Sequence, residues 1–457
     1  MFNVEKKKYE LYKKGIAHIT VNPGTNRVVR IHLIPPKYRV FSSKPAVAIV
    51  NGYYIVPIRI GWYILLYHYI EEVVSPGKKK FSQDEWKEII DRTVSRTRQV
   101  FNGISEEELK ADLVKILDKL EGIATKNIKE YKGKYLSLKQ YAPFIIAPHR
   151  MDLMVSAMKK DGVWNCTNNC VLCYACGEPK SELEELDTAS WKRIIDICRE
   201  NHIPQLTFTG GEPTMREDLP ELIAYASWFV TRLNTNGTLL SEELCTRLKE
   251  ASLDNIQITL YSSDEKIHNA LVGNETFEKT KQGIINALKV GLDVSVNTPI
   301  CSLNSDYVKT LEFLKSLGVE YVTCSGIIQG GAAIDENATS YGLSEDELLK
   351  ILATAKRYCD KNNMDINFTL PGCVDEKKLK SIGFQPPVCG ACLSNMAIAP
   401  DGTVVPCQSW LNEKRDLGNI LHTNWKEIWN NRLCRSIRRK SEKELFQCLL
   451  PSRRKNK

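Results

Sequence analysis

The sequence contains the stretch Cys166-Thr-Asn-Asn-Cys170-Val-Leu-Cys173, in which three cysteines follow a predicted strand at Leu153–Ala157 with the spacing C-x3-C-x2-C. Three thiolates at this spacing on one loop can hold three corners of a cubane iron–sulfur cluster and leave one iron without a protein ligand. The alternative is a tetrahedral zinc site, which needs a fourth ligand such as Cys176 or His202. The stretch alone does not decide between an iron–sulfur cluster and a zinc site.

A second motif, Thr209-Gly210-Gly211-Glu212-Pro213, lies at the end of the next predicted strand, Gln205–Thr209. Two glycines allow a ligand to approach the backbone, and Glu212 can offer a carboxylate to an amino group. Because this motif comes one strand–helix unit after the cysteines, we expect both at the same rim of a parallel sheet.

Strand and helix patterns alternate across residues 151–365. The further predicted strands are Val230–Asn234, Asn255–Leu260, Asp293–Thr298 and Tyr321–Ser325. The predicted helices are Thr188–Asn201, Glu217–Trp228, Ser241–Glu250, Phe277–Lys289, Ser305–Leu317 and Ser344–Lys361. Six such repeats predict parallel strands with right-handed crossovers, in an open sheet or barrel whose loops at the strand C-termini carry the chemistry.

With these two motifs the sequence resembles the radical S-adenosylmethionine (SAM) superfamily from about Asp152 onwards. The resemblance implies an α/β fold with a partial (β/α)6 barrel and a [4Fe-4S] cluster on Cys166, Cys170 and Cys173. It also implies that SAM chelates the fourth iron and is cleaved reductively to a 5′-deoxyadenosyl radical, which abstracts a substrate hydrogen.

The resemblance further implies SAM contacts at other strand ends. Asn234-Thr235-Asn236-Gly237 looks like the family's Thr-Asn-Gly turn, and an Arg that often follows the His after the fourth strand is missing beside His268. No catalytic residue is assigned; Tyr261, Cys324 and Cys176 are candidates for later proton or electron steps. The residues expected to bind the cofactor are Leu172, Gly210, Gly211, Glu212, Asn236, Thr259, Ser262, Asn297 and Gln329.

Residues 366–457 look like the small C-terminal iron–sulfur domain of SPASM and Twitch enzymes. A hairpin around Asp401-Gly402 is expected to bring Cys392 towards Cys407. Six cysteines are too few for two four-thiolate clusters, so the prediction is one auxiliary [4Fe-4S] cluster of the Twitch kind. Its expected ligands are Cys389, Cys392, Cys407 and Cys448, with Cys373 a competitor for the fourth place and Cys434 assigned to packing; the other cysteines, except the ambiguous Cys176, are expected to be buried hydrophobes.

Residues 1–150 contain no cysteine and mix strand-like runs with amphipathic helices. We interpret them as a recognition domain, possibly a winged-helix module that binds a precursor peptide. Basic residues gather at both ends of the chain, with nine Lys and Arg against two acids in residues 1–40 and ten against two in 432–457. Such ends could attract an acidic partner.

The leading functional hypothesis is a radical SAM enzyme that modifies a peptide or protein side chain and takes electrons from a flavodoxin or ferredoxin. One alternative is cofactor biosynthesis of the molybdenum-cofactor cyclase type, although that enzyme's Gly-Gly tail is absent. The other is a non-catalytic zinc- and nucleic-acid-binding protein. The sequence has no apolar run long enough for a membrane span and no signal-peptide h-region, so we expect a soluble cytoplasmic protein. In that compartment disulfides rarely persist, so the 15 cysteines call for metal binding or burial.

Overall fold

The structure is a computed structural model that describes residues 16–22, 28–35, 46–78, 80–124, 135–412, 416–443 and 446–450. Its contacts divide the chain into two compact units. Unit 1 comprises residues 1–147, 198–204 and 228–230, and unit 2 comprises 148–197, 205–227 and 231–457. Much of the basic N-terminal end and residues 451–457 lie outside the described residues.

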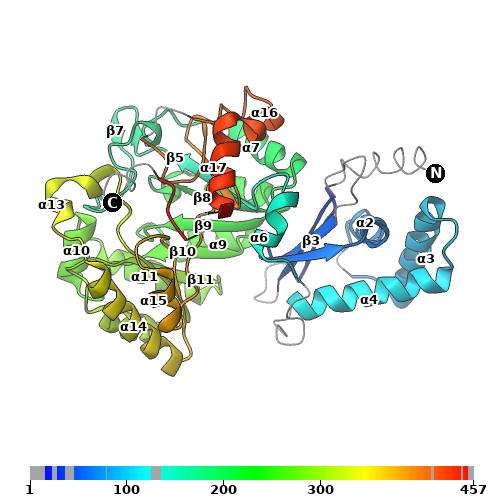
Figure 1. Ribbon diagram of the computed structural model, residues 1–457, viewed down its shortest axis with the longest axis horizontal. Helices are drawn as coiled ribbons and strands as arrows, with labels where there is room; N and C mark the ends of the chain where they lie inside the picture. The colour runs from blue at the N-terminus through cyan, green and yellow to red at the C-terminus, as the bar shows by residue number, and fades with distance from the viewer. Residues whose placement is uncertain are drawn as a thin grey trace. The chain divides into compact units, whose positions relative to one another are not determined.

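Unit 1 is built on a four-stranded antiparallel sheet in the order β1-β2-β3-β4 (Figure 1). The many β-branched Val and Ile residues favour these strands, which are β1 (His18–Val21), β2 (Val29–Ile34), β3 (Ala46–Val50) and β4 (Tyr54–Ile58). The helices that follow are α2 (Ile60–Val74), α3 (Gln83–Val100), α4 (Glu106–Ala124), the short α6 (Leu138–Tyr141) and η1 (Ala142–Phe144).

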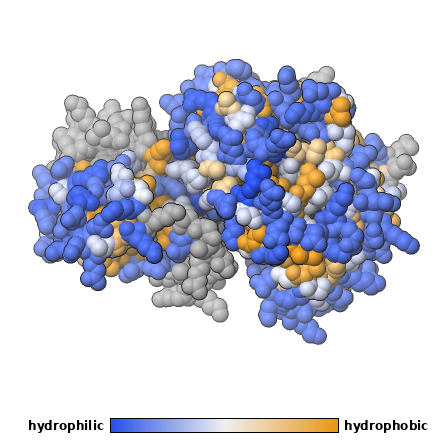
Figure 2. All heavy atoms as spheres, turned by 180° about the vertical axis from the view of Figure 1, so that it is seen from behind, coloured by the Kyte–Doolittle hydropathy of each residue, from blue (hydrophilic) through white to orange (hydrophobic). Residues whose placement is uncertain are grey.

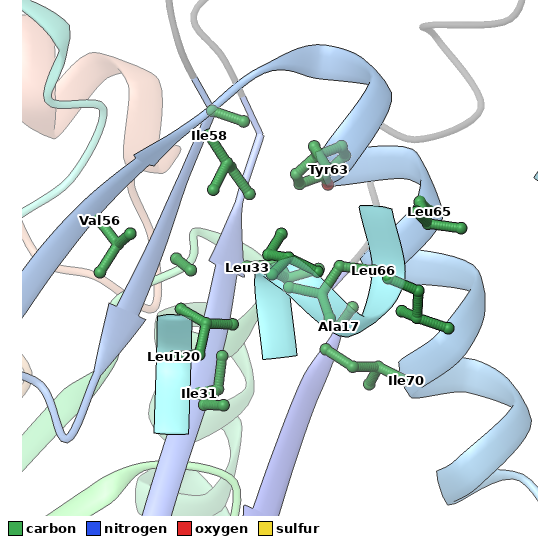
Figure 3. Close-up of a cluster of buried hydrophobic side chains, with 14 of the residues drawn as sticks. Ala17, Ile31, Leu33, Val56, Ile58, Tyr63, Leu65, Leu66, Ile70 and Leu120 are labelled. Atoms are coloured by element: carbon green, nitrogen blue, oxygen red, sulfur yellow. The ribbon is translucent and has the colours of Figure 1, made fainter. Parts of the chain in front are cut away.

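The core of unit 1 lies between this sheet and the helices. Leu33 and Val56 from the sheet belong to the same buried cluster as Leu65 and Leu66 from α2, and all four are 0–1% exposed (Figure 3). α3 starts with a capping box, because Ser82 and Glu85 each accept a hydrogen bond from the backbone N–H of the other. Unit 1 therefore has its own hydrophobic core.

Unit 2 contains a nine-stranded sheet in the order β13-β12-β11-β10-β9-β8-β5-β14-β15 (Figure 1). β5 is parallel to its neighbours β14 and β8, and the strands from β9 to β13 are parallel to one another, whereas β14 pairs with β15 in antiparallel fashion. The strands are β5 (Arg150–Ser156), β8 (Gln205–Gly210), β9 (Val230–Thr235), β10 (Asn255–Thr259), β11 (Val294–Pro299), β12 (Tyr321–Ser325), β13 (Asp365–Phe368), β14 (Asn395–Ile398) and β15 (Val404–Val405), with a separate small sheet of β6 (Lys159–Lys160) and β7 (Val163–Trp164).

Helices connect most successive strands of this sheet, two more follow its last strand, and their buried faces carry apolar residues at helical spacing. They are η2 (Pro179–Ser181), α7 (Thr188–Glu200), η3 (Pro213–Met215), α8 (Leu219–Tyr225), α9 (Glu242–Glu250), α10 (Glu265–Val272), α11 (Phe277–Lys289), α12 (Tyr307–Ser316), η4 (Gly331–Ile334), α13 (Glu336–Thr339), α14 (Glu345–Lys361), α15 (Glu376–Ser381), α16 (Trp425–Asn430) and α17 (Arg432–Lys443).

The predicted α/β fold is confirmed, with six consecutive barrel strands β5, β8, β9, β10, β11 and β12 in chain order across the sheet. The strand β13, the helix α10 and the pairing of β14 with β5 were not predicted. β14 aligns Met396 with Met151 and Ile398 with Leu153, so the C-terminal region extends the barrel sheet beyond the predicted domain boundary at residue 365. The domain boundaries themselves stay predictions.

The face of the molecule in Figure 2 is mostly hydrophilic, with small hydrophobic patches between the hydrophilic residues. Among the described residues no helix is both long and apolar enough to cross a membrane.

Candidate active site and metal centre

The loop with Cys166, Cys170 and Cys173 follows β7, and its three thiols lie within electrostatic range of one another. Burial is the main cause that raises the pKa of each thiol, to about 12 for Cys166. Hydrogen-bond donors oppose this effect. The backbone N–H of Asn168 and the side-chain amide of Asn236 point at Cys166, the latter at 3.7 Å.

The sulfur of Cys173 receives backbone N–H groups from Ala175 and Cys176, and the sulfur of Cys170 receives the hydroxyl of Tyr261. Donors aimed at sulfur stabilise the thiolate, which is the form that binds metal. The buried Cys198 differs, because burial alone raises the pKa of its thiol. The loop cysteines therefore fit an iron–sulfur cluster as ligands, whereas Cys198 fits packing.

Among the described residues, no three His, Cys, Asp or Glu side chains are grouped tightly enough to hold a single metal ion. His202, a proposed fourth zinc ligand, belongs to unit 1, whereas the loop cysteines belong to unit 2.

The glycines of the second motif allow β8 to approach β5 closely. A Cβ on Gly210 would overlap the carbonyl oxygen of Ser156, and one on Gly211 would lie 2.6 Å from that of Ala157. Gly210 also has φ +144°, which L side chains rarely adopt. The groups that these glycines admit are backbone atoms of β5 and of the segment after it, at the point where the β5–β8 register shifts.

Glu212 is 1% exposed and its carboxylate accepts four hydrogen bonds. Oε1 accepts from the backbone N–H of Thr214 (3.0 Å), from the Thr214 hydroxyl (2.5 Å) and from the Thr235 hydroxyl (2.7 Å). Oε2 accepts from the backbone N–H of Asn236 (2.8 Å). Burial raises the pKa of Glu212 although these donors lower it. Oε2 retains a lone pair with which it could accept from an amino group.

Asn236 joins the third strand end to the cysteine loop. Its Nδ2 donates to the hydroxyl of Thr167 at 2.8 Å, and its Oδ1 accepts from the backbone and hydroxyl of Thr238. The Thr167 and Thr238 hydroxyls lie 2.6 Å apart. The position of Cys166 is thereby tied to the end of β9.

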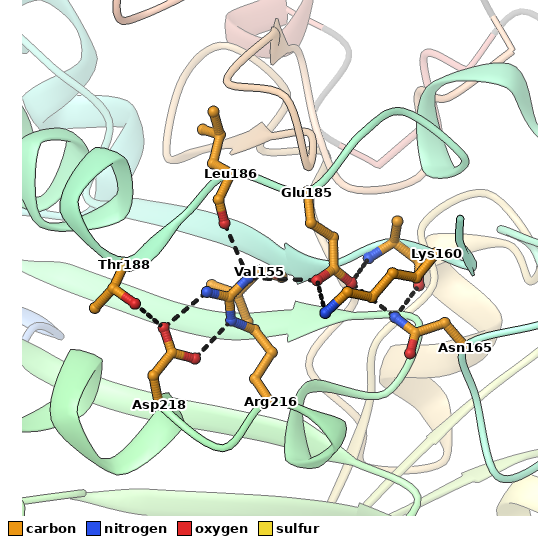
Figure 4. A network of polar contacts seen from close by, with 9 residues as sticks. Val155, Lys160, Asn165, Glu185, Leu186, Thr188, Arg216 and Asp218 are labelled. Carbon is orange, nitrogen blue, oxygen red and sulfur yellow. Dashed lines mark hydrogen bonds and ion pairs between the residues drawn. The ribbon is translucent and has the colours of Figure 1, made fainter. Parts of the chain in front are cut away.

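A network of ion pairs and hydrogen bonds around Glu185 and Arg216 also supports the cysteine loop (Figure 4). Glu185 accepts from the backbone of Ala157 (2.9 Å) and from Nδ2 of Asn165 (2.7 Å), the residue before Cys166. Arg216, four residues after Glu212, donates to the Val155 carbonyl (3.0 Å) and forms an ion pair with Asp218 at 2.8 Å. Both cofactor motifs are thus fixed to the end of β5.

Two predicted SAM contacts, Thr259 and Asn297, are register partners on β10 and β11. Asn297 accepts from the hydroxyl of Thr323 at 2.8 Å, and that hydroxyl accepts from Gln257 at 3.2 Å. Ser262 is buried and accepts from the backbone N–H of Asp264, which is a local turn contact.

Of the remaining predicted contacts, Leu172 lies within the cysteine loop and Gln329 precedes a segment that packs on it. Leu172 belongs to a buried cluster with Tyr261 and Leu271. Gln329 precedes Gly330 and Gly331, and a Cβ on Gly331 would lie 2.5 Å from the Cys173 carbonyl oxygen. The loop after β12 therefore packs directly on the cysteine loop.

Three of the C-terminal cysteines lie close together. Cys407 lies within electrostatic range of Cys389 and Cys448, and its sulfur accepts from the backbone N–H of Ser409. A Cβ on Gly372, next to Cys373, would lie 3.2 Å from the backbone nitrogen of Cys448. The structure thus brings together the predicted ligands Cys389, Cys407 and Cys448.

Cys392 has φ +54° and lies against Cys434, to which its thiol is hydrogen-bonded. Cys434 is buried as predicted, yet Nη1 of Arg438 donates to its sulfur at 3.4 Å. Arg438 also donates to the Trp429 carbonyl and stacks 3.9 Å above the Trp429 ring.

Sequence reasoning missed the residues that support the site: Thr235, Thr167, Glu185, Arg216 and the Arg438–Cys434 pair. Thr235 and Thr167 stand next to predicted site residues, so their hydroxyls were a usable signal. Glu185 and Arg216 gave no such signal, because exposed charges are common and only the structure shows that their side chains are 7% and 10% exposed.

Two family models match the chain. One, described as the radical SAM superfamily, matches residues 165–314, and the other, SPASM, described as an iron-sulfur cluster-binding domain, matches residues 389–449. The first covers the cysteine loop and the Gly-Gly-Glu motif, and the second covers Cys389 to Cys448.

Solved structures of similar fold include Streptococcus suis SuiB bound to precursor peptide SuiA, with a TM-score of 0.57 and 15% identity over 86% of this chain and 87% of that one. SuiB bound to SAM has the same values. Native anSMEcpe with bound AdoMet and Kp18Cys peptide has a TM-score of 0.52 and 17% identity over 64% of this chain and 83% of that one. At these identities the likeness concerns the fold. The cyclase and zinc-protein alternatives are not favoured.

Proposed function

From the premise that this chain is a radical SAM enzyme with a C-terminal SPASM domain, we propose that it modifies a side chain of a peptide or protein. The observation that carries the proposal is the convergence of the Cys166, Cys170 and Cys173 loop with Glu212 and Asn236 at the C-terminal ends of the barrel strands.

Cys166, Cys170 and Cys173 would hold the catalytic [4Fe-4S] cluster, and Glu212 would accept from the SAM amino group through Oε2. Gly210, Gly211 and Asn236 keep these groups in place, and Leu172, Thr259, Ser262, Asn297 and Gln329 would line the rest of the cofactor site. When bound, the cluster and SAM supply a carbon radical that abstracts hydrogen. The protein's task is to exclude water and to hold the target C–H bond in position.

A peptide substrate is supported by two observations. The structures of similar fold include SuiB bound to its precursor peptide SuiA and anSMEcpe bound to the Kp18Cys peptide. Unit 1 is a separately cored module, and among its described strands β1 pairs with β2 alone, so its outer edge could accept an extended peptide by strand addition. We infer that unit 1 docks the peptide.

The SPASM region would hold an auxiliary cluster on Cys389, Cys392, Cys407 and Cys448. In a Cys166→Ala/Cys170→Ala/Cys173→Ala background, the protein should keep about four irons per chain. Adding Cys448→Ser should remove them, whereas adding Cys434→Ser should not. Iron and acid-labile sulfide analysis measures both, and loss of iron with Cys434→Ser would reassign the fourth ligand.

The proposed function is tested by 5′-deoxyadenosine formation under a strong reductant. The wild type should form it, and the triple alanine variant should form none while remaining folded by circular dichroism. Incubation with candidate peptides, followed by mass spectrometry, should show a mass change that the triple variant does not produce. If the triple variant still formed 5′-deoxyadenosine, the proposed cluster site would be contradicted. If only small molecules changed in mass, the proposed peptide substrate would be contradicted.

A further inference from the structure

The helix α17 has two opposite faces. Cys434, Ile437 and Ser441 are buried on one face, at positions i, i+3 and i+7. Ser441 donates to the Ala391 carbonyl at 2.7 Å, and Cys434 lies against Cys392. This face of α17 therefore covers the Cys389–Cys392 loop.

The opposite face carries cations. We define the α17 cationic face as the exposed side chains on this side of the helix: Arg432, Arg435, Arg439, Lys440 and Lys443. Glu442 is the only acid in the helix. Among the described residues no ion pair neutralises any of the five cations, although Lys192, Lys289 and Lys378 elsewhere in the unit are paired.

From this arrangement we propose that the α17 cationic face docks an acidic one-electron carrier protein, which reduces the iron–sulfur centre beneath it. The inference rests on the proposed function, because a radical SAM enzyme needs an external electron. In the step the reduced carrier loses one electron and the enzyme's iron–sulfur centre gains it, and no bond or proton moves.

Three properties favour a redox carrier over an acidic peptide. The face lies one helix thickness, roughly 10 Å, from the auxiliary cysteines, which is a short path for an electron. Weak electrostatic docking of opposite charges is typical of redox encounters, which bury little area. Unit 1 already offers a separate module for a peptide.

The test compares Arg435→Glu/Arg439→Glu/Lys443→Glu with a matched control, Lys279→Glu/Lys350→Glu/Lys361→Glu. The control changes the net charge equally at exposed lysines on α11 and α14. The assay is 5′-deoxyadenosine formation driven either by reduced flavodoxin or by dithionite. At low salt the α17 variant should lose about tenfold or more of the flavodoxin-driven rate, and the control less than about twofold.

The dithionite-driven rates of all three proteins should agree within about twofold, because dithionite needs no docking face. Flavodoxin binding, measured by calorimetry at low and high salt, should weaken with salt in the wild type and be lost in the α17 variant. Equal flavodoxin-driven rates in the α17 and control variants would overturn the proposal. So would a parallel fall of flavodoxin-driven and dithionite-driven rates in the α17 variant, which would indicate a substrate-binding face. If neither the wild type nor either variant forms 5′-deoxyadenosine, the proposed function fails. The calorimetry would still show whether flavodoxin binds at the α17 cationic face.

Discussion

Glu212 shows how a single side chain can serve both the fold and the site. Its buried carboxylate accepts the backbone N–H groups of Thr214 and Asn236, and these donors are left unsatisfied if the carboxylate is removed. Glu212→Ala should therefore lower the free energy of unfolding by about 2–4 kcal/mol and weaken SAM binding.

The matched control for Glu212 is Glu217→Gln, which changes an exposed carboxylate in the same segment and should leave both properties unchanged. Calorimetric unfolding and SAM titration provide the measurements. Unaltered unfolding in Glu212→Ala would mean that the hydrogen bonds contribute little.

At this scale, the sequence predicted the residues whose chemistry is distinctive. Cysteine spacing and a Gly-Gly-Glu stretch are rare enough to identify, and the structure gathers both. The two glycines were predicted to let a ligand approach the backbone. In the structure, Gly210 and Gly211 instead make room for the backbone around the end of β5. The contact of Cys434 with Cys392 could not be predicted, since the two residues lie far apart in the sequence and meet through helix docking.

Among the elements, the loop after β12 packs against the cysteine loop at Gly331, beside the hydrogen bond from the Ala332 N–H to the Cys173 carbonyl (2.9 Å). Gly331 has φ +53°, and its added Cβ would meet the backbone of Cys173, Tyr174 and Cys176. Gly331→Ala should displace the cysteine loop and lower the iron bound at the catalytic site by at least about half, since backbone strain of this kind must be relieved by movement.

Gly330→Ala is the natural comparison for Gly331→Ala. Its backbone is extended, and its nearest neighbour would be 3.4 Å from the new Cβ. Iron analysis of both variants in a background that lacks Cys389 and Cys407 isolates the catalytic cluster. Equal iron in the two variants would argue against the proposed packing.

The pair of helices α2 and α3 in unit 1 should be sensitive to acid. His68 Nδ1 lies 3.1 Å from the Thr97 hydroxyl, whose own proton is donated to the Thr93 carbonyl, so the histidine donates. Burial lowers the pKa of His68 to about 4. The unfolded chain then binds a proton more readily than the folded one, and stability falls as the pH drops from about 6.5 towards 4.

Acidification from pH 7 to pH 5 should therefore cost unit 1 about 2 kcal/mol through this residue. His68→Asn retains a donor and removes the titration, so its melting temperature should change less with pH than that of the wild type. Parallel pH profiles for the two proteins would exclude His68 as a source of the sensitivity.

For the whole molecule, the pairing of β14 with β5 makes the SPASM region part of the barrel sheet. Met396, Ala397 and Ile398 are 0% exposed. A chain truncated after Leu370 should aggregate, because it exposes the edge of β5 and the apolar surface that β14 covers.

Truncation after Leu450 removes none of the described elements and should leave a soluble protein. Size-exclusion chromatography of the two truncated chains is the measurement. A monomeric chain ending at Leu370 with a full catalytic cluster would show that the barrel is independent of its C-terminal region.

Repeating strand and helix patterns predicted the barrel because each strand–helix unit is a local signal, and β12 and α11 match their predicted bounds. The sheet's outer strands were missed for different reasons. β13 is short, and the pairing partner of β14 is a strand from the other end of the unit, which no local pattern encodes.

The β5–β14 pairing also sets an order of events during synthesis. β5 begins at Arg150, and the strand that covers its edge begins at Asn395, so most of the chain must leave the ribosome before that edge can close. The cysteine loop, in contrast, can meet β8 and Glu212 early. Iron could therefore enter the catalytic site of a nascent chain well before the auxiliary cysteines exist, and a stalled or slowly translated chain would expose an open sheet edge to chaperones.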